Sequence, residues 1–149
     1  MVVGANTMTV TCPEDVFELL MIGQKSRAVS STNTNERSSR SHTIFVIEVV
    51  QNLSDGSRKK SRLNLVDLAG SERISKSGAT GKLLDEAKSI NLSLTTLGLC
   101  IKQLTDGQSF ANFRDSKLTY YLRESLGGNS KTTLVCTASK QIAHLEESL

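Results

Sequence analysis

Residues 42–68, HTIFVIEVVQNLSDGSRKKSRLNLVDL, contain the two clearest strand patterns of the chain with a turn signal between them. Residues 42–50 form a near-continuous run of β-branched and aromatic side chains, and residues 62–68 alternate in part, so both segments predict strands. The dipeptide Asp55-Gly56 lies between them and is the strongest short signal for a hairpin. The sequence therefore predicts two antiparallel strands joined by a turn.

A strand and a helix are predicted before this hairpin. Residues 1–11 are rich in β-branched types and predict a strand. Pro13 and the two acidic residues after it suit a first helical turn, so a helix is expected from Pro13 to about Lys25. Its apolar side is expected to consist of Val16, Phe17, Leu19, Leu20 and Ile22.

Two helices and a strand are predicted after the hairpin. A second, shorter helix is expected over residues 115–126 and a last strand over residues 131–138. The strongest helix pattern covers residues 83–104, where apolar side chains recur every three or four positions: Leu83, Ala87, Ile90, Leu94, Leu97, Ile101 and Leu104. The expected fold class is α/β, with a central sheet flanked by helices.

The composition fits a single folded domain or a piece of a larger one. Of the 149 residues, 38% are hydrophobic and 22% are charged, which excludes disorder throughout. No apolar run approaches the roughly 18 residues of a membrane helix, and the N-terminus lacks a signal-peptide pattern, so we expect a soluble, intracellular chain without a membrane partner. The three cysteines form no CxxC pair and are expected to be buried thiols: Cys12, Cys100 and Cys136.

The positive charge of the chain is concentrated in its middle. The formal net charge is +3, and the net charge is −2 over residues 1–57, +6 over residues 58–131 and −1 over residues 132–149. Such a distribution favours an acidic partner, and the sign of the charge alone does not choose among nucleic acid, an anionic membrane and an acidic protein surface. With two Tyr, four Phe and no Trp, stacking on nucleic-acid bases has little support, so nucleic acid is the least favoured partner.

The first candidate site is a polar loop over residues 28–41, which is long for a compact domain and dense in hydroxyl and amide side chains. Serine hydroxyls can coordinate Mg²⁺ or hydrogen-bond a terminal phosphate, and Arg40 offers a planar guanidinium to a phosphate or a carboxylate. The alternative is a serine-rich surface loop without function.

The second candidate site follows the predicted strand over residues 62–68. Asp67 at the end of that strand can hold Mg²⁺ through water, and Gly70 can present its backbone N–H to a γ-phosphate. The alternative is an ordinary turn at a strand end, because short Asp-x-x-Gly patterns are common. The two loops flank one hairpin and can reach one phosphate together, with Arg40 and Glu72 forming an ion pair when nucleotide is bound.

The segment LGGNSKTT, residues 126–133, is similar to a phosphate-binding P-loop but does not fit one. The motif GxxxxGK[ST] needs glycine at the positions of Ser125 and Ser130, and it connects a strand to a helix rather than a helix to a strand. We interpret this segment as a helix cap and a turn.

Several motifs resemble, in order and spacing, the second half of the kinesin motor domain, from about Val2 to the C-terminus. They are NERSSRSH, VDLAGSER, LDEAKSINLSLTTLGLCIKQL and FRDSKLTYYLRESLGGNSKT. The resemblance implies a P-loop NTPase fold that hydrolyses MgATP and moves along microtubules, with tubulin and ATP as partners and the cytoplasmic cytoskeleton as location. Residues 1–149 would then be the C-terminal part of a motor domain, incomplete at both ends.

The resemblance also implies roles for single residues. NERSSRSH matches switch I, which places Asn35, Ser38 and Ser39 at the nucleotide, with Ser39 also at Mg²⁺, and makes Arg40 a mobile ion-pair partner. VDLAGSER matches switch II. Its residues are expected to bind Mg²⁺ through water (Asp67), sense the γ-phosphate (Gly70) and pair with Arg40 near the attacking water (Glu72).

The remaining matches concern the long helix and the basic surface. Asn91 lies in a segment that matches the family's INxSL motif and is expected among the catalytic residues. The face toward tubulin, which is acidic, is expected to carry Arg73, Lys76, Lys82, Lys88, Arg114 and Lys117. Without the resemblance, scattered lysines of this kind are most often a solvated surface.

The chain departs from the family pattern in one important respect. It contains no GxxxxGK[ST] motif, so we expect that it does not hydrolyse ATP alone and does not bind MgATP tightly. The predicted last strand would lack neighbouring strands, which predicts that the isolated chain folds poorly. The alternative to a motor fragment is a module that binds tubulin without catalysis.

Overall fold

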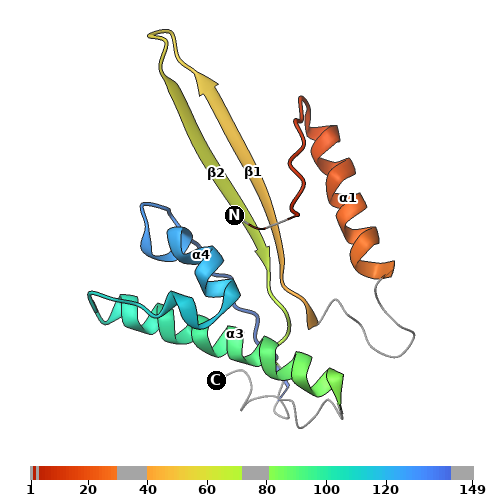
Figure 1. Ribbon diagram of the computed structural model, residues 1–149, viewed down its shortest axis with the longest axis vertical. Helices are drawn as coiled ribbons and strands as arrows, with labels where there is room; N and C mark the ends of the chain where they lie inside the picture. Colours follow the sequence, from red (N-terminus) through yellow and green to blue (C-terminus); the bar gives the residue numbers. More distant parts are fainter. Residues whose placement is uncertain (1, 3, 30–39, 72–80, 142–149) are drawn as a thin grey trace. The chain divides into compact units, whose positions relative to one another are not determined.

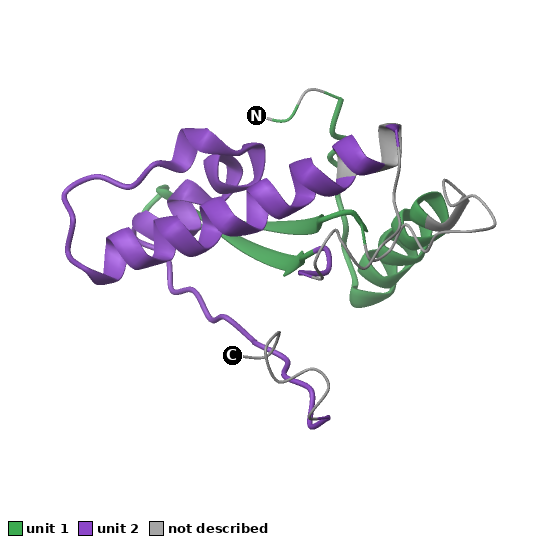
Figure 2. Cartoon of the chain, turned by 90° about the horizontal axis from the view of Figure 1, so that it is seen from below, with its two compact units in different colours: residues 1–68 green, residues 69–149 purple. Residues whose placement is uncertain are grey.

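The computed structural model describes residues 2, 4–29, 40–71 and 81–141 (Figure 1). Its elements are α1 (Pro13–Val29), β1 (Thr43–Asn52), β2 (Arg58–Asp67), α3 (Lys82–Thr105), the short 3₁₀ helix η2 (Phe113–Asp115) and α4 (Lys117–Gly127). The chain divides into two compact units, residues 1–68 and residues 69–149 (Figure 2). Of the helices formed by the described residues, none is long and apolar enough to cross a membrane.

The predicted hairpin is confirmed. Strands β1 and β2 pair antiparallel, with Thr43 opposite Asp67 at one end and Asn52 opposite Arg58 at the other. Both strands extend further toward the turn than predicted. At the turn, the Leu53 N–H donates to the Ser57 carbonyl at 2.8 Å, and Gly56 adopts a φ of 80°, which only glycine takes at little cost.

Cross-strand ion pairs support the hairpin on one face. Glu48 lies opposite Arg62, and its carboxylate contacts the Arg62 guanidinium at 2.5 Å and the Lys60 amine at 2.9 Å. Hydrogen bonds from Lys60 and then Arg62 hold the pKa of Glu48 below its usual value. Opposite charges across two strands contribute modestly to pairing here, because the Lys60 and Arg62 side chains are 60% and 53% exposed and water screens their charges.

Helix α1 begins as predicted and extends beyond Lys25 to Val29. The Asp15 carboxylate accepts hydrogen bonds from the backbone N–H groups of Thr11 at 2.9 Å and Cys12 at 3.3 Å, which caps the first turn. The expected single apolar side is covered only in part. Val16, Leu19 and Leu20 are half-buried, whereas two members of that side are exposed: Phe17 and Ile22.

The second unit is built on the packing of α3 against η2 and α4, as Figure 1 shows. Helix α3 confirms the long predicted helix, and the members of its apolar stripe whose side chains are described are buried or half-buried. Its Cys100 is fully buried, and the other buried apolar residues described in this unit are Ala69, Leu97, Ala111, Leu118 and Leu122. Each buried aliphatic side chain contributes about 1.5–3 kcal/mol.

Helix α4 confirms the second predicted helix, and its start is fixed by hydroxyl groups. Ser116 is the N-cap residue, and its side chain accepts from the Thr119 backbone N–H at 3.0 Å. The buried Thr119 hydroxyl donates to the Phe113 carbonyl at 2.8 Å, which joins η2 to α4. The polar core of this unit is therefore satisfied by hydrogen bonds.

Three expectations are wrong. The described residues among 1–11 form no strand, and neither do residues 131–138, which are exposed. A strand needs a neighbour to satisfy its backbone N–H and C=O groups, and the described part of the chain supplies none beside these segments. Of the three cysteines, only Cys100 is buried, while Cys12 and Cys136 are exposed. The sheet formed by the described residues accordingly has two strands.

Candidate functional site

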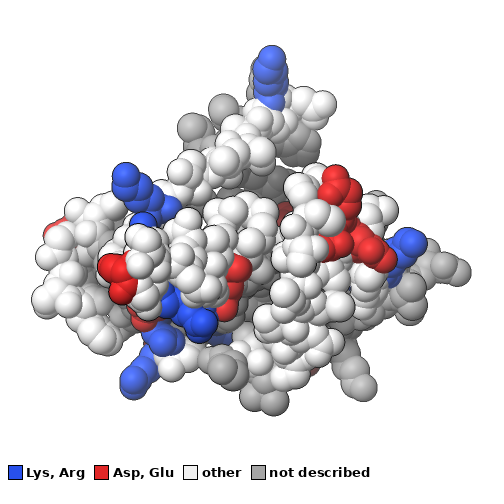
Figure 3. Space-filling model, turned by 90° about the horizontal axis from the view of Figure 1, so that it is seen from above, with Lys and Arg blue, Asp and Glu red and all other residues white. Residues whose placement is uncertain are grey.

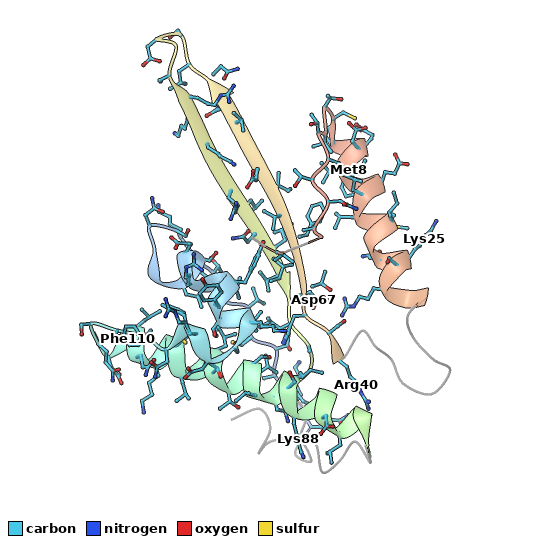
Figure 4. All side chains as sticks on the ribbon, viewed as in Figure 1. Met8, Lys25, Arg40, Asp67, Lys88 and Phe110 are labelled. Carbon is cyan, nitrogen blue, oxygen red and sulfur yellow. The ribbon has the colours of Figure 1, made fainter. Side chains whose placement is uncertain are left out.

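The polar residues predicted around the hairpin lie at one end of it. Because Thr43 pairs with Asp67, Arg40, three residues before Thr43, lies at the same end of the hairpin as Asp67 (Figure 4). Residues 40–42, directly before β1, and Leu68, directly after β2, therefore adjoin the same end of the two strands. The binding of one phosphate by both segments stays a prediction.

Asp67 is held by an arginine that the sequence did not single out. Arg27, in the last turn of α1, places its Nη1 3.0 Å from Oδ2 of Asp67. Its Nη2 donates to the Ser41 carbonyl at 3.3 Å. Arg27 thus joins the end of α1, the approach to β1 and the end of β2. A basic residue in a last helical turn was the available signal, but it does not reveal a partner 40 residues away.

The surroundings of Asp67 suit a water-mediated contact with Mg²⁺. A carboxylate is the hard oxygen ligand that Mg²⁺ prefers, and the Asp67 side chain is 69% exposed, so it can accept from water while paired with Arg27. The described residues contain no group of three His, Cys, Asp or Glu side chains that could hold a metal. The role of Asp67 at a bound Mg²⁺ stays a prediction. Ser39, the other predicted metal residue, lies outside the described residues.

Arg40 has an available donor. Its side chain is half-buried, and its Nη1 is buried without a hydrogen-bond partner among the described residues. A buried charged donor without a partner is costly, so this nitrogen favours an anionic partner such as a phosphate or a carboxylate. The residues predicted to lie nearest to it in function are outside the described residues: Asn35, Ser38, Ser39 and Glu72.

Gly70 and Asn91 belong to the second unit. Gly70 is half-buried and directly follows the buried Ala69, while Asn91 lies half-buried within α3. Arg40 and Asp67 belong to the first unit. The structure therefore describes Gly70 with Asn91, and Arg40 with Asp67, each within its own unit. A joint role of all four at one nucleotide stays a prediction.

The predicted basic surface falls on the second unit where it is described. Lys88 on α3, Arg114 in η2 and Lys117 at the start of α4 are all exposed. Figure 3 shows exposed Lys and Arg side chains in blue and exposed Asp and Glu side chains in red. Lys82 is the first residue of α3, and the two others predicted for this surface lie outside the described residues: Arg73 and Lys76.

Two exposed side chains of α4, Tyr120 and Arg123, contact each other. The Arg123 guanidinium lies 4.5 Å from the centre of the Tyr120 ring, and its Nη1 also donates to the Tyr120 carbonyl at 3.3 Å. A cation over an aromatic face is attracted by the ring quadrupole. Tyr120 and Arg123 therefore form an exposed cation–aromatic pair on α4.

Comparison with known proteins supplies the family. The kinesin motor domain model matches residues 1–149. The chain is 52% identical over 147 residues to Kinesin-related protein 5 of Dictyostelium discoideum and 51% identical over 148 residues to Kinesin-like protein 3 of Schizosaccharomyces pombe. Each match covers 98% of this chain, but only 15% and 27% of the respective relative.

A solved structure agrees. The chain is similar to a KIF14 dimer in a two-heads-bound state, with AMP-PNP and in complex with a microtubule, at a TM-score of 0.84 and 40% identity. That match covers 99% of this chain and 43% of the solved one. The chain therefore spans less than half the length of these relatives. Residues 1–149 belong to the kinesin motor domain family.

Proposed function

We propose that this chain is the part of an ATP-driven microtubule motor that carries the nucleotide-sensing switches and part of the microtubule-binding face. The observation that carries the proposal is the common location of Arg40 and Asp67 at one end of the β1–β2 hairpin, with a donor of Arg40 available. The family's P-loop NTPase fold would add the strands and the phosphate-binding loop that residues 1–149 do not contain. The two-stranded sheet would then be part of a wider central sheet.

The proposed nucleotide chemistry follows from the charges at that end of the hairpin. Phosphoryl transfer depends on positioning and on stabilising negative charge, so a guanidinium and a water-binding carboxylate are suitable groups. Asp67, and Ser39 from the other switch, would hold Mg²⁺, which supplies charge neutralisation at the phosphates. Arg40 would change partner between nucleotide states, with Glu72 as its carboxylate partner. Gly70 and Asn91 would connect the nucleotide to α3.

The proposed partner surface is the basic part of the second unit. The KIF14 relative was solved in complex with a microtubule, and its match covers 99% of this chain. Lys88, Arg114 and Lys117 are exposed and positively charged, as binding to acidic tubulin requires. Arg73, Lys76 and Lys82 would extend this face.

The test uses a chimeric motor, because the chain spans only part of the length of its relatives and a relative can supply the rest of the motor domain. In this chimera, residues 1–149 replace the matching segment of the motor domain of Dictyostelium Kinesin-related protein 5, to which they are 52% identical. We expect ATP hydrolysis that microtubules accelerate. The matched control is the unmodified Dictyostelium motor. A chimera that pellets with microtubules but does not hydrolyse ATP would support the non-catalytic tubulin-binding module instead.

The 149-residue chain alone gives a second, independent measurement. We expect no ATP turnover from it, because its sequence contains no GxxxxGK[ST] motif. ATP turnover by the isolated chain above that of an empty-vector preparation would contradict this expectation.

A further inference from the structure

Helix α1 leaves one of its faces uncovered within its unit. Arg27, in the last turn of α1, contacts Asp67 and Ser41, so the side of the helix that carries Arg27 is turned toward the hairpin. The opposite side carries a row of four residues at spacings of four, three and four, with one further residue on each flank. The row is Glu14, Glu18, Met21 and Lys25, the flanks are Phe17 and Ile22, and we call these six exposed residues the α1 outer face. Figure 4 shows Lys25 on the side of α1 away from the hairpin.

The apolar side chains of the α1 outer face are large and lie close together. The exposed fractions are 66% for Phe17, 54% for Met21 and 55% for Ile22. Phe17 and Met21 are four residues apart and therefore neighbours on the helix surface, and Ile22 follows Met21 directly. A helix at a protein surface usually presents charged and polar residues to water. Three large apolar side chains within about two turns of that side therefore indicate a surface for contact with another molecule.

The charges of the α1 outer face identify the molecule that fits it. Glu14 lies in the first turn of α1, and Lys25 lies about three turns further along the same side. Two parallel copies of the helix would bring Glu14 next to Glu14 and Lys25 next to Lys25, and these like charges repel. Two antiparallel copies bring Glu14 of each next to Lys25 of the other, with the apolar residues between the two ends. The α1 outer face is therefore complementary to itself, as the contact of a two-fold dimer requires.

We propose that the α1 outer face binds the same face of a second copy of this chain, with the two helices antiparallel. A two-fold axis at the middle of the face places Phe17 opposite Ile22 of the second copy, and Glu18 opposite its Met21. This proposal goes beyond the proposed function and does not rest on it. The contact consists of one face of a 17-residue helix, so it belongs with the interfaces below about 1,200 Å² that associate transiently. We expect a dimer Kd on the order of 100 μM.

Two-fold symmetry makes each substitution act twice in the dimer. Lys25→Glu replaces both attractions to Glu14 by repulsions and should raise the dimer Kd about tenfold or more. Glu14→Lys should do the same. An equimolar mixture of the two variants restores opposite charges at both ends, because one copy then has glutamate at positions 14 and 25 and the other has lysine at both. The mixture should therefore associate more tightly than either variant alone.

The experiment is sedimentation-velocity analytical ultracentrifugation of the chimeric motor from about 10 to 300 μM, a range around the expected Kd. All variants share the rest of the Dictyostelium motor, so differences between them report on residues 1–149. Met21→Gln with Ile22→Gln removes the apolar contact, and Met21→Leu with Ile22→Leu keeps it. On α3, in the other unit, Leu99→Gln at a position 54% exposed is the matched control for a lost apolar side chain, and Lys102→Glu is the control for a reversed charge.

The unchanged chimera should approach twice the mass of its dilute form as its concentration rises. The glutamine variant should raise the dimer Kd about tenfold or more, whereas the leucine variant and both α3 controls should associate like the unchanged chimera. Association that is equal in all variants, or a mixture of the two folded charge variants that associates no better than each alone, would overturn the proposal. A constant mass of the unchanged chimera would also overturn it. In that case, lower urea stability of the glutamine variant would assign the α1 outer face to a contact within the motor domain.

The outcome is independent of the proposed function. ATP hydrolysis and pelleting with microtubules are measured on the same preparations. A chimera that associates through the α1 outer face but neither hydrolyses ATP nor pellets with microtubules would overturn the proposed function alone. A chimera that does both while its mass stays constant would overturn the α1 contact alone.

Discussion

Arg27 and Asp67 form an ion pair, with Nη1 3.0 Å from Oδ2, although 40 residues of sequence separate them. The same guanidinium also donates to the Ser41 carbonyl, so one side chain joins the end of α1 to both strands of the hairpin at the end where Arg40 lies. If Asp67 contacts Mg²⁺ through water in the complete motor, Arg27 is the group that fixes the orientation of its carboxylate.

The double contact of Arg27 predicts an asymmetry between two substitutions. Arg27→Met removes the ion pair and the bond to Ser41, whereas Asp67→Asn removes the charge of one partner. In the chimera, we expect Arg27→Met to lower the free energy of unfolding by about 1–2 kcal/mol and Asp67→Asn by about half as much. The coupling should stay below about 1 kcal/mol because Asp67 is largely exposed. Urea unfolding of the single and double variants measures both quantities, and equal losses would contradict the Ser41 contact.

The role proposed for Arg40 predicts loss of hydrolysis without loss of nucleotide binding. Arg40→Ala or Glu72→Ala in the chimera should lower ATP turnover by about 100-fold or more, because each removes a group that positions charge at the γ-phosphate. Binding of a fluorescent ATP analogue should change little. Arg58→Ala is the matched control, since Arg58 lies in the same hairpin at the opposite end. Near-normal turnover in either variant would reject the ion-pair role.

The basic surface predicts a change in salt dependence. Replacing Lys76, Lys88 and Arg114 together with alanine should weaken microtubule binding at low salt and flatten its dependence on ionic strength. Cosedimentation at several salt concentrations measures the slope. The control variant replaces Arg58, Lys59 and Lys60, which removes the same charge from the other unit. An unchanged slope in the first variant would reject the assignment of this surface to tubulin.

Local patterns predicted the elements that are stabilised by their own neighbours in sequence. The hairpin and helix α3 formed as expected because Asp55-Gly56 fixes the turn and the apolar spacing of α3 matches the surface that α4 covers. Residues 131–138 have the composition of a strand but no neighbouring strand among the described residues, and composition cannot supply one.

The candidate site was predictable where it depended on motifs and not where it depended on tertiary contacts. Arg40 and Asp67 could be placed at one end of the hairpin because antiparallel pairing determines which residues meet. Arg27 could not be placed at this end from the sequence, because its contacts with Asp67 and Ser41 depend on where the end of α1 lies against the strands.

The cysteines give a prediction that tests the core of the second unit. Cys100 is fully buried, and burial raises the pKa of its thiol, so less thiolate is available for alkylation. In the chimera at pH 8, iodoacetamide should modify Cys100 at least about tenfold more slowly than in the same chimera unfolded in urea, as read from the Cys100 peptide by mass spectrometry. Equal rates with and without urea would show that α3 and α4 are not packed.

Glu48 predicts the direction of a pH effect on the hairpin. Its pKa is lower in the folded chain than the ordinary value of 4.5, because Lys60 and Arg62 bond its charged form. The unfolded chain therefore binds the proton at a higher pH than the folded one, and the contribution of Glu48 to stability, present above pH 4.5, is lost as pH falls through the folded pKa. Unfolding of the chimera and its Glu48→Gln variant between pH 6 and pH 3 measures this. The stability difference between them should shrink as pH falls, and a difference that grows would show that Glu48 is not held by these two cations.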